Sequence, residues 1–560
     1  MQNNNNDGQW WKTATIYQIY PKSFCDSGAK GSGDLKGIIS KLDYLQTLGI
    51  DAIWLTPIYP SPMVDNGYDI ADYYGVNPDF GTMQDFEQLL SEAHQRNIRI
   101  IMDIVVNHTS TEHEWFQSAL GNKESPYRDY YIWKDPVDDE VPNNWQSKFG
   151  GSAWEFDPVS NQYYLHLFAK QQADLNWENP LVRQVVKEVI GFWAEKGVDG
   201  FRLDVINLIS KQQDFANDEQ GDGRRFYTDG PRVHEYLQEI SRDVFQQYGA
   251  VTVGEMSSTT LEHCQQYSRL DGKELSMVFN FHHLKVDYPD GEKWTKAPFD
   301  FLQLKQIFNH WQTGLNGKGW GALFWCNHDQ PRIVSRLGCD GEYRVESAKM
   351  LAAALHMMQG TPYIYQGEEI GMTNPGFQSL SQYRDVESTN MYQIMLQQQK
   401  ADHDQMMAIL AQKSRDNSRT PMQWNSLEFA GFSQVQPWID IAPNYQKVNA
   451  EQALDDKDSV FYFYQRLIEL RKNVPVITDG DYRDLLPEHP SVFAYQRQND
   501  QQTLICISNF YPQWVNVELS DELQLESGHY LIGNYRDCQQ QSVSANQLLR
   551  PYETKVILLN

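Results

Sequence analysis

The segment VRQVVKEVIGFWAEKGVDGFRLDV (182–205) decides the fold class, because it joins a helix pattern directly to a strand pattern. Residues 182–197 carry apolar side chains at helical spacing and end at Gly197, where a helix C-cap is expected. Residues 198–205 are a short apolar run that ends on charged side chains. A helix that leads into a short apolar strand is typical of α/β proteins with a parallel sheet.

The same alternation repeats along the chain. Eight strand-like runs are expected in all, and most are followed by an amphipathic helix such as 35–49, which ends at Gly49, or 86–97. The runs lie at 14–20, 51–57, 98–106, 198–205, 251–255, 276–281, 321–329 and 362–369. Eight such units with right-handed crossovers predict an α/β fold, the (β/α)8 TIM barrel.

Two stretches are too long to be ordinary connections. Residues 108–177 follow the third strand and predict an inserted subdomain, and residues 371–455 predict a helical insertion before the helix 459–473 that closes the barrel. Short alternating strands from about residue 485 predict a C-terminal antiparallel β-domain. We therefore expect a catalytic barrel at 1–107 and 178–480, an inserted subdomain at 108–177 and a β-domain at 481–560.

Composition limits the possible partners. The 560 residues carry a formal charge of −27, so we expect no nucleic-acid partner and no membrane partner, because both need a positive surface. An anionic ligand would need a local basic cluster. The six cysteines show no metal-binding or disulfide spacing, and the N-terminal residues do not resemble a signal peptide. We expect a cytoplasmic protein, a monomer, with no cofactor.

Polar side chains gather at the carboxyl ends of the predicted strands, the end of a barrel that carries active sites. A single carboxylate there is commonly structural, but several strand ends contribute here. The residues are Asp65, Tyr68, His108, Arg202, Asp204, Glu255, His328 and Asp329. Paired carboxylates without a nucleophilic cysteine or serine arrangement indicate glycoside hydrolysis, with one carboxylate as nucleophile and one as proton donor.

Four segments carry a resemblance to a known family. In order along the chain, DIVVNH (103–108), GFRLDV (200–205), VGEM (253–256) and FWCNHD (324–329) resemble the four signature regions of the α-amylase family of retaining glycosidases. The resemblance covers essentially the whole chain. It implies that Asp204 is the nucleophile, that Glu255 is the general acid/base, and that Asp329 is a third carboxylate that binds two hydroxyls of the sugar.

The resemblance also implies roles for the neighbouring residues. Arg202 lies two residues before the nucleophile and shares its strand face, so its charge is expected to keep Asp204 ionised. Asp103 is expected to order Arg202 rather than touch substrate. His108 and His328 are expected to hydrogen-bond the glucose, and Tyr68 to stack under its ring.

Further motifs resemble the oligo-1,6-glucosidase-like branch of the family. They are DNGYD (65–69), QADLNWENP (172–180) and SRDNSRTPMQW (414–424). The branch implies that Asp65 and Arg415 clamp the non-reducing glucose and close the pocket beyond one sugar; the alternative for Arg415 is a salt bridge in a surface loop. Val205, after the nucleophile, resembles enzymes that cleave linkages other than that of maltose.

The segment FNFHHLKVDYPDGEKWTK (279–296) bears on the leaving group. Together with residues 221–232 and 254–264 it resembles members of the branch that act on a phosphorylated disaccharide, a small-molecule partner. His282, Lys285 and Lys293 are the predicted phosphate-binding residues, because lysine and histidine bind phosphate when they converge. Three acidic residues cancel the three lysines of this segment, so a solvated loop is the alternative. The neutral disaccharide isomaltose is then the rival substrate.

A calcium site is not expected. Many relatives carry a loop of the form DxNxDGxGD, whereas this chain has DSGAKGSGD (26–34), in which Gly28 and Lys30 replace two oxygen donors. One hypothesis puts the Lys30 ammonium in the place of the ion.

Two rival functions have less support from the residues. The arginine-rich loop expected of sucrose isomerases is not evident in 330–343. A non-catalytic transporter subunit would lack the catalytic carboxylates that are present here. Both functions are therefore less favoured than glycoside hydrolysis.

Overall fold

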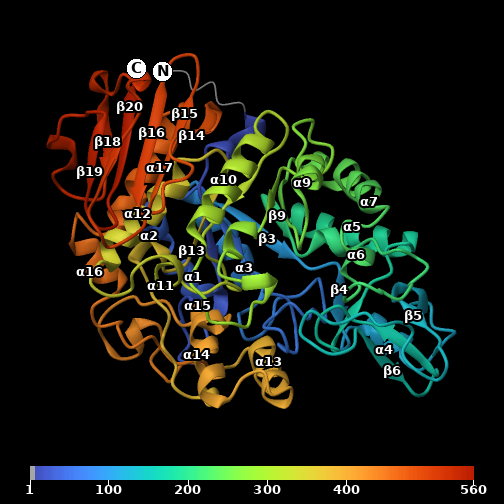
Figure 1. Cartoon of the computed structure of the whole chain (residues 1–560). Helices are drawn as coiled ribbons and strands as arrows, with labels where there is room; N and C mark the ends of the chain where they lie inside the picture. Colours follow the sequence, from blue (N-terminus) through green and yellow to red (C-terminus); the bar gives the residue numbers. More distant parts are fainter. Residues whose placement is uncertain (1–6, 560) are drawn as a thin grey trace.

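The computed structural model describes residues 7–559, and the eight predicted strands form one parallel barrel (Figure 1). The strand order is β11-β10-β9-β3-β2-β1-β13-β12, and a parallel bridge between Val278 and Gly321 joins the two ends. In chain order the barrel strands are β1 (Ile16–Ile19), β2 (Ala52–Leu55), β3 (Arg99–Ile104), β9 (Gly200–Leu203), β10 (Val251–Glu255), β11 (Met277–Phe279), β12 (Ala322–Leu323) and β13 (Thr361–Tyr365). The predicted fold class is confirmed.

Strand register brings the charged side chains of neighbouring strands to the same end of the barrel. β3 pairs with β9 so that Asp103 lies opposite Arg202, and β9 pairs with β10 so that Arg202 lies opposite Val253. Glu255 is the last residue of β10 and lies opposite Phe279 of β11. These side chains therefore meet at the carboxyl end of the barrel, where active sites of this fold lie.

Helices surround the barrel. They include α3 (Met83–Gln95), α5 (Pro180–Glu195), α12 (Arg344–His356) and α17 (Val460–Asn473). The helix predicted at 35–49 is instead two helices, α1 (Leu35–Ile39) and α2 (Leu42–Leu48), and the Ser40 hydroxyl between them donates to the Gly37 carbonyl at 2.7 Å. Gly49 caps α2 with a φ of 95°, a conformation that glycine adopts without strain.

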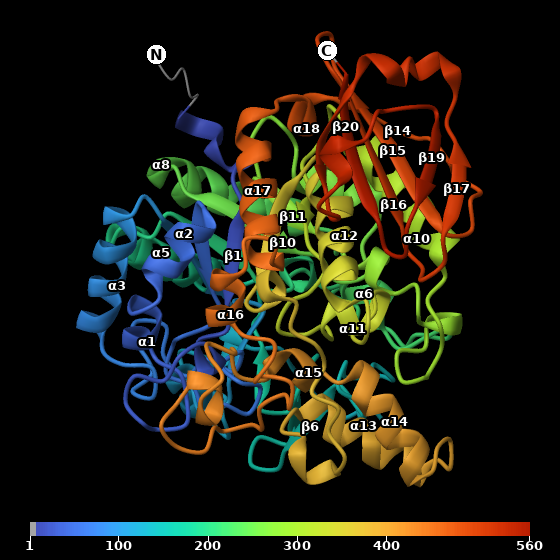
Figure 2. The ribbon, with the colours of Figure 1, turned by 90° about the vertical axis from the view of Figure 1, so that its left-hand side faces the viewer.

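Two excursions from the barrel flank its carboxyl end (Figure 2). After β3, the chain forms β4 (His108–Ser110) with β8 (Gln172–Asp174), and a three-stranded sheet of β5 (Trp133–Lys134), β7 (Gln162–Leu165) and β6 (Trp154–Asp157). After β13, it forms α13 (Val386–Gln397), α14 (His403–Lys413), α15 (Asp416–Arg419) and α16 (Ala450–Asp455). The backbone at Gly150 reaches α13, because a Cβ there would lie 2.6 Å from Ile394 Cδ1.

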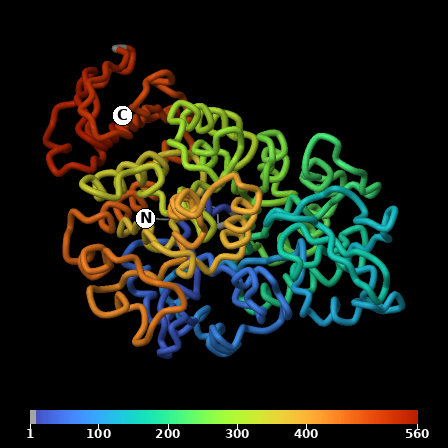
Figure 3. The backbone as a smooth tube through the Cα atoms, turned by 60° about the horizontal axis from the view of Figure 1, so that its bottom comes forward, coloured from blue at the N-terminus to red at the C-terminus, as the bar shows by residue number. Residues whose placement is uncertain are grey.

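The C-terminal residues form an antiparallel sheet at the opposite side of the barrel from the inserted strands (Figure 3). Its order is β14 (Asp481–Asp484), β15 (Val492–Gln498), β16 (Thr503–Asn509), β20 (Thr554–Leu559) and β18 (His529–Gly533). β17 (Val515–Glu518) pairs separately with β19 (Asn546–Leu549). All six cysteines are free thiols. Within residues 7–559, none of the helices has the length and apolar character that a membrane span requires.

Candidate active site

One cavity of about 280 Å³ opens at the carboxyl end of the barrel. Its wall contains most of the residues that the sequence predicts for the site: Asp65, Tyr68, His108, Asp204, Glu255, Lys285, Lys293, Asp329 and Arg415. Asp204 follows β9 directly and Glu255 ends β10, so the two carboxylates project from neighbouring strands. Arg202 and His328 lie behind this wall and are almost completely buried.

The Arg202 guanidinium joins three carboxylates at the floor of the cavity. Its Nη1 donates to Asp103 Oδ1 at 2.8 Å and to Asp204 Oδ1 at 2.6 Å, and its Nη2 donates to Glu255 Oε2. Asp103 Oδ2 accepts from the Tyr68 hydroxyl at 2.9 Å. Asp103 thus fixes the positions of both Arg202 and Tyr68 by hydrogen bonds. The Arg202 guanidinium in turn holds the carboxylates of Asp204 and Glu255 next to each other.

Burial and charge separate the pKa values of the two carboxylates. Burial raises the pKa of Asp204 to about 6, although Arg202 opposes the shift. Burial raises the pKa of Glu255 to about 8. The positive charge of Arg202 opposes this rise, and the negative charges of Asp204 and Asp329 add to it. Arg202 therefore limits the rise at Asp204 but does not cancel it. Near pH 7 the arrangement favours an ionised Asp204 and a protonated Glu255, as a nucleophile and an acid require.

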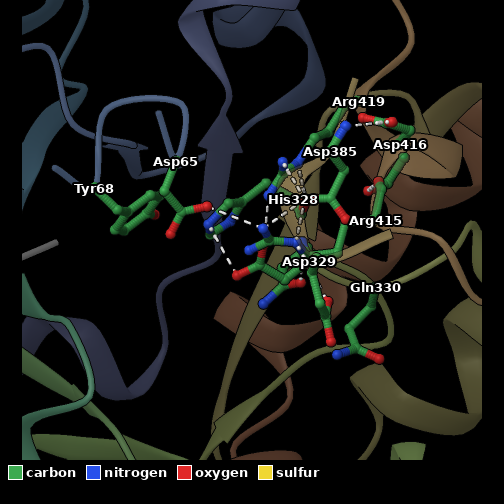
Figure 4. A network of polar contacts seen from close by, with 12 residues as sticks. Asp65, Tyr68, His328, Asp329, Gln330, Asp385, Arg415, Asp416 and Arg419 are labelled. Carbon is green, nitrogen blue, oxygen red and sulfur yellow. Dashed lines mark hydrogen bonds and ion pairs between the residues drawn. The ribbon is translucent and has the colours of Figure 1, made fainter. Parts of the chain in front are cut away.

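A pair of arginines holds the innermost end of the cavity (Figure 4). Arg415 Nη2 donates to Asp65 Oδ1 at 2.9 Å, and Nη1 donates to Asp329 Oδ1 at 3.2 Å. Arg419 Nη2 donates to the same Asp329 oxygen at 2.6 Å. Burial alone would raise the pKa of Asp329, but His328 and the two guanidinium groups outweigh it and hold that pKa well below its usual range. Arg415 is buried, so the alternative of a surface salt bridge is wrong.

Two residues of this network are absent from the sequence predictions. Asp385, which is fully buried, accepts from Arg415 Nε at 2.9 Å and from its Nη2 at 2.5 Å (Figure 4). Arg419 also donates from Nε to the His328 carbonyl at 2.8 Å. Arg419 is the second arginine of the SRDNSR motif, so its position after Arg415 was the available signal. Asp385 lies outside every motif and offered none.

The two histidines and the tyrosine pack together. The Tyr68 and His328 rings stack with centroids 5.1 Å apart, and His328 Nδ1 lies 2.8 Å from Gln18 Nε2. His108 Nε2 lies 3.0 Å from the Tyr68 carbonyl oxygen and 3.2 Å from Gln172 Nε2. Burial lowers the pKa of His108 to about 4 and that of His328 to about 3, so both rings are neutral near pH 7 and can donate one hydrogen bond each.

Basic side chains line the cavity beyond Glu255. They are Lys148, Arg224, Lys285 and Lys293. Lys148 Nζ donates to Ser257 Oγ at 3.1 Å, and neither Lys148 nor Lys285 forms an ion pair with any residue between 7 and 559. Burial, with the like charge of Arg224, lowers the pKa of Lys148 to about 7. The sequence predictions missed Lys148, which lies in the inserted subdomain, and Arg224, although Arg224 falls within the stretch 221–232.

The three predicted phosphate-binding residues differ in placement. Lys285 lines the cavity with its side chain accessible. Lys293 also lines it, but its Nζ is bound to both oxygens of Glu387, at 2.8 and 2.7 Å. His282 is not part of the cavity wall, and its ring packs against Trp311 with centroids 5.1 Å apart. The structure therefore brings Lys285 and Lys293 to the site and leaves His282 outside it.

Comparison with known families agrees with this geometry. Residues 18–480 match the family described as alpha amylase, catalytic domain, and residues 482–554 match maltogenic amylase, C-terminal domain. The chain belongs to the α-amylase family. This family membership extends over the barrel, its insertions and the C-terminal sheet.

Individual members of the α-amylase family resemble the chain over nearly its whole length. The trehalose-6-phosphate hydrolases of Bacillus subtilis (strain 168) and Escherichia coli (strain K12) are each 59% identical, over 98% and 97% of this chain and 98% of each relative. An oligo-1,6-glucosidase of Bacillus cereus is 50% identical over 98% of this chain and 99% of the relative. The crystal structure of Bacillus licheniformis trehalose-6-phosphate hydrolase superposes with a TM-score of 0.94 at 57% identity, covering 98% of this chain and 100% of that one.

The loop 26–34, where no calcium site is expected, is held together by hydrogen bonds from backbone N–H groups to its carboxylates. The Asp26 carboxylate accepts from the backbone N–H groups of Gly28 and Gly31, at 2.9 and 2.8 Å. Asp34 accepts from the backbone of Gly37 at 2.7 Å. Lys30 is exposed and forms no ion pair with any described residue, so the structure does not place its ammonium between the two aspartates.

We predict a bell-shaped pH profile of kcat/KM with limbs near pH 6 and pH 8. Activity falls below the first limb because Asp204 takes up a proton, and above the second because Glu255 loses one. Initial rates on 4-nitrophenyl α-glucoside, a neutral substrate, measure the profile. Replacing Glu255 with Gln should remove the alkaline limb from the residual activity. A wild-type optimum below pH 5 would contradict the assignment.

Proposed function

We propose that the protein hydrolyses α,α-trehalose 6-phosphate to glucose and glucose 6-phosphate with retention of configuration. The observation that carries this proposal is the charge of the outer cavity wall. Lys148 and Lys285 face the cavity without a counter-ion among the described residues, in a chain of net charge −27. Basic groups without a carboxylate partner beside a catalytic centre favour an anionic leaving group, and a bound phosphate would raise the pKa of Lys148 from about 7 and keep it charged. The substrate named for the two 59% identical relatives, trehalose 6-phosphate, has that charge.

The inner end of the cavity suits the unmodified glucose. The ion pair of Asp65 and Arg415, at 2.9 Å, supports a cavity that closes beyond one sugar. Asp329 is bound to the same arginine and would accept hydrogen bonds from the sugar hydroxyls. The phosphorylated glucose then lies on the other side of the scissile bond. Of the predicted phosphate-binding residues we keep Lys285 as a full contact and Lys293 as a weaker one, because Glu387 already binds Lys293. We add Lys148 and Arg224 because they line the same wall.

The reaction follows from the two carboxylates. A carboxylate oxygen of Asp204 attacks the anomeric carbon while Glu255 gives its proton to the glycosidic oxygen, so that glucose 6-phosphate leaves. Glu255, now a carboxylate, takes a proton from water as that water attacks the same carbon and releases Asp204. Two inversions give net retention. Both carboxylates contact one guanidinium, Arg202, which supports the close spacing of a retaining enzyme.

The ion pair of Lys293 with Glu387 is the observation that favours the rival substrate, isomaltose. This ion pair leaves one region of the wall neutral, and Glu387 could accept hydroxyl hydrogen bonds from an uncharged sugar. The two lysines without such a partner favour the phosphorylated sugar, so isomaltose is the second candidate.

Purified protein should release glucose and glucose 6-phosphate from trehalose 6-phosphate far faster than it cleaves trehalose or isomaltose at equal concentration. A charge-assisted contact to phosphate contributes about 1.5–3 kcal/mol, which corresponds to roughly 10–100-fold in kcat/KM for each lysine engaged. Chromatography of the products measures all three rates. Faster cleavage of isomaltose would overturn the proposal and leave the roles of Asp204 and Glu255 intact.

We further propose that the protein acts as a cytoplasmic monomer. The chain itself supplies both catalytic carboxylates, the Asp65–Arg415 ion pair and the basic side chains of the cavity, which supports a monomer. Six free thiols suit a reducing compartment.

A further inference from the structure

Asp287, Arg336 and Lys413 form a buried ion cluster. It lies behind the basic wall of the cavity, by which we mean the side lined by Lys148, Arg224, Lys285 and Lys293. The Asp287 carboxylate accepts from Arg336 Nη2 at 2.7 Å and from Arg336 Nε at 3.0 Å. Lys413 Nζ lies 2.6 Å from the same carboxylate and donates to the Asp287 carbonyl at 3.0 Å. The three side chains are 7%, 3% and 2% exposed, so this cluster is part of the interior.

The cluster fixes one side of the cavity through Arg336. Besides Asp287, the Arg336 guanidinium donates to the Leu284 carbonyl and, at 2.8 Å, to Gln330 Oε1. Leu284 and Gln330 both line the cavity, as does Tyr288. The Tyr288 ring lies 5.5 Å from the Arg336 guanidinium carbon and 4.9 Å from Lys413 Nζ. The loop 284–288 is therefore held from behind at several points.

The same cluster also leaves Lys285 free to face the substrate. Asp287 lies two residues from Lys285, and by sequence its charge cancels that lysine. In the structure Arg336 and Lys413 occupy the Asp287 carboxylate, so Lys285 reaches the cavity without a counter-ion among the residues described. A phosphate group would otherwise have to displace the aspartate from Lys285.

We propose that Asp287, held by Arg336 and Lys413, is a positioning residue that sets the preference for a phosphorylated over a neutral leaving group. It acts through the loop 284–288, which presents Lys285 and Tyr288 to the outer sugar, and it touches no substrate itself. The inference rests on the proposed function, because it concerns the same outer part of the cavity.

The test compares two arginine-to-lysine variants. Arg336→Lys keeps the positive charge, but one ammonium cannot bind Asp287, Leu284 and Gln330 together. The matched control is Arg183→Lys, because Arg183 binds Glu239 at 2.8 Å and the Trp177 carbonyl at 2.8 Å and does not line the cavity. KM and kcat are measured for trehalose 6-phosphate and for 4-nitrophenyl α-glucoside.

Arg336→Lys is expected to raise KM for trehalose 6-phosphate about 10-fold and to change kcat, and both constants for the aryl glucoside, less than about 3-fold. Arg183→Lys should change neither substrate's constants. Equal losses on both substrates, or an unchanged ratio of the two KM values, would overturn the inference.

A milder variant guards against misfolding. Lys413→Met leaves the two Arg336–Asp287 bonds in place and removes only the second support, so it should fold and raise KM for the phosphorylated sugar about 3-fold. If Arg336→Lys does not fold, Lys413→Met provides the test instead. An unchanged ratio of the two KM values in Lys413→Met would then reject the positioning role of Asp287. A wild-type preference for isomaltose would instead reject the proposed function, whatever the variants do.

Discussion

Replacing Asp204 with Ala is expected to lower kcat by about 10⁴-fold or more, because no other group can attack the anomeric carbon. Replacing Glu255 with Ala should cost roughly 10²–10⁴-fold on the natural substrate, and less on an aryl glucoside whose leaving group needs little protonation. Initial rates on 4-nitrophenyl α-glucoside and on trehalose 6-phosphate measure both losses. Asp204 and Glu255 share Arg202, so loss of activity alone does not separate their roles.

Azide separates them by stereochemistry. In the Asp204 variant, azide should attack the bound aryl glucoside directly and give the β-glucosyl azide. In the Glu255 variant, Asp204 should still form the glucosyl-enzyme, and azide should attack that intermediate to give the α-glucosyl azide. NMR of the azide products distinguishes the two anomers. The same anomer from both variants would contradict the assignment of nucleophile and acid/base.

The barrel could be predicted from sequence because its signal is local. Each run of apolar residues, such as 198–205, carries its strand tendency within a few residues, and a helix with its cap separates it from the next. Asp204 and Glu255 follow from the same signal, since both lie at strand ends. The break between α1 and α2 was not predicted. The Ser40 hydroxyl donates to the Gly37 carbonyl there, and apolar periodicity carries no sign of such a side-chain contact.

The outer half of the site could not be derived in this way. Lys148 reaches the cavity through a loop of the inserted subdomain, and no local pattern places that loop beside Ser257. Counting charges along 279–296 suggested a neutral segment, whereas the structure pairs Asp287 with Arg336 and Lys413 from distant helices. Charge pairing of this kind depends on tertiary contacts, which sequence spacing does not determine.

Removing positive charge from the basic wall of the cavity is expected to have the second large effect, a weaker binding of the phosphorylated substrate. The double replacement Lys148→Met and Lys285→Met is expected to raise KM for trehalose 6-phosphate about 100-fold, at roughly 10-fold for each lysine. Methionine keeps most of the side-chain volume and removes the charge, so the wall should stay packed. Neither ammonium has a counter-ion among the described residues, so removing them leaves no carboxylate unpaired. Folding should therefore be unaffected.

The control for this prediction is Lys293→Met, which removes a lysine of the same wall that is already bound to Glu387. It should raise KM far less than the double variant, because its charge is neutralised before substrate arrives. KM for 4-nitrophenyl α-glucoside should be unchanged in the double variant, because its aryl group carries no phosphate. Raising the salt concentration should weaken binding of trehalose 6-phosphate to the wild type and have little effect on the double variant. If the double variant instead lost activity equally on both substrates, the two lysines would serve the glucose pocket or the fold rather than the phosphate.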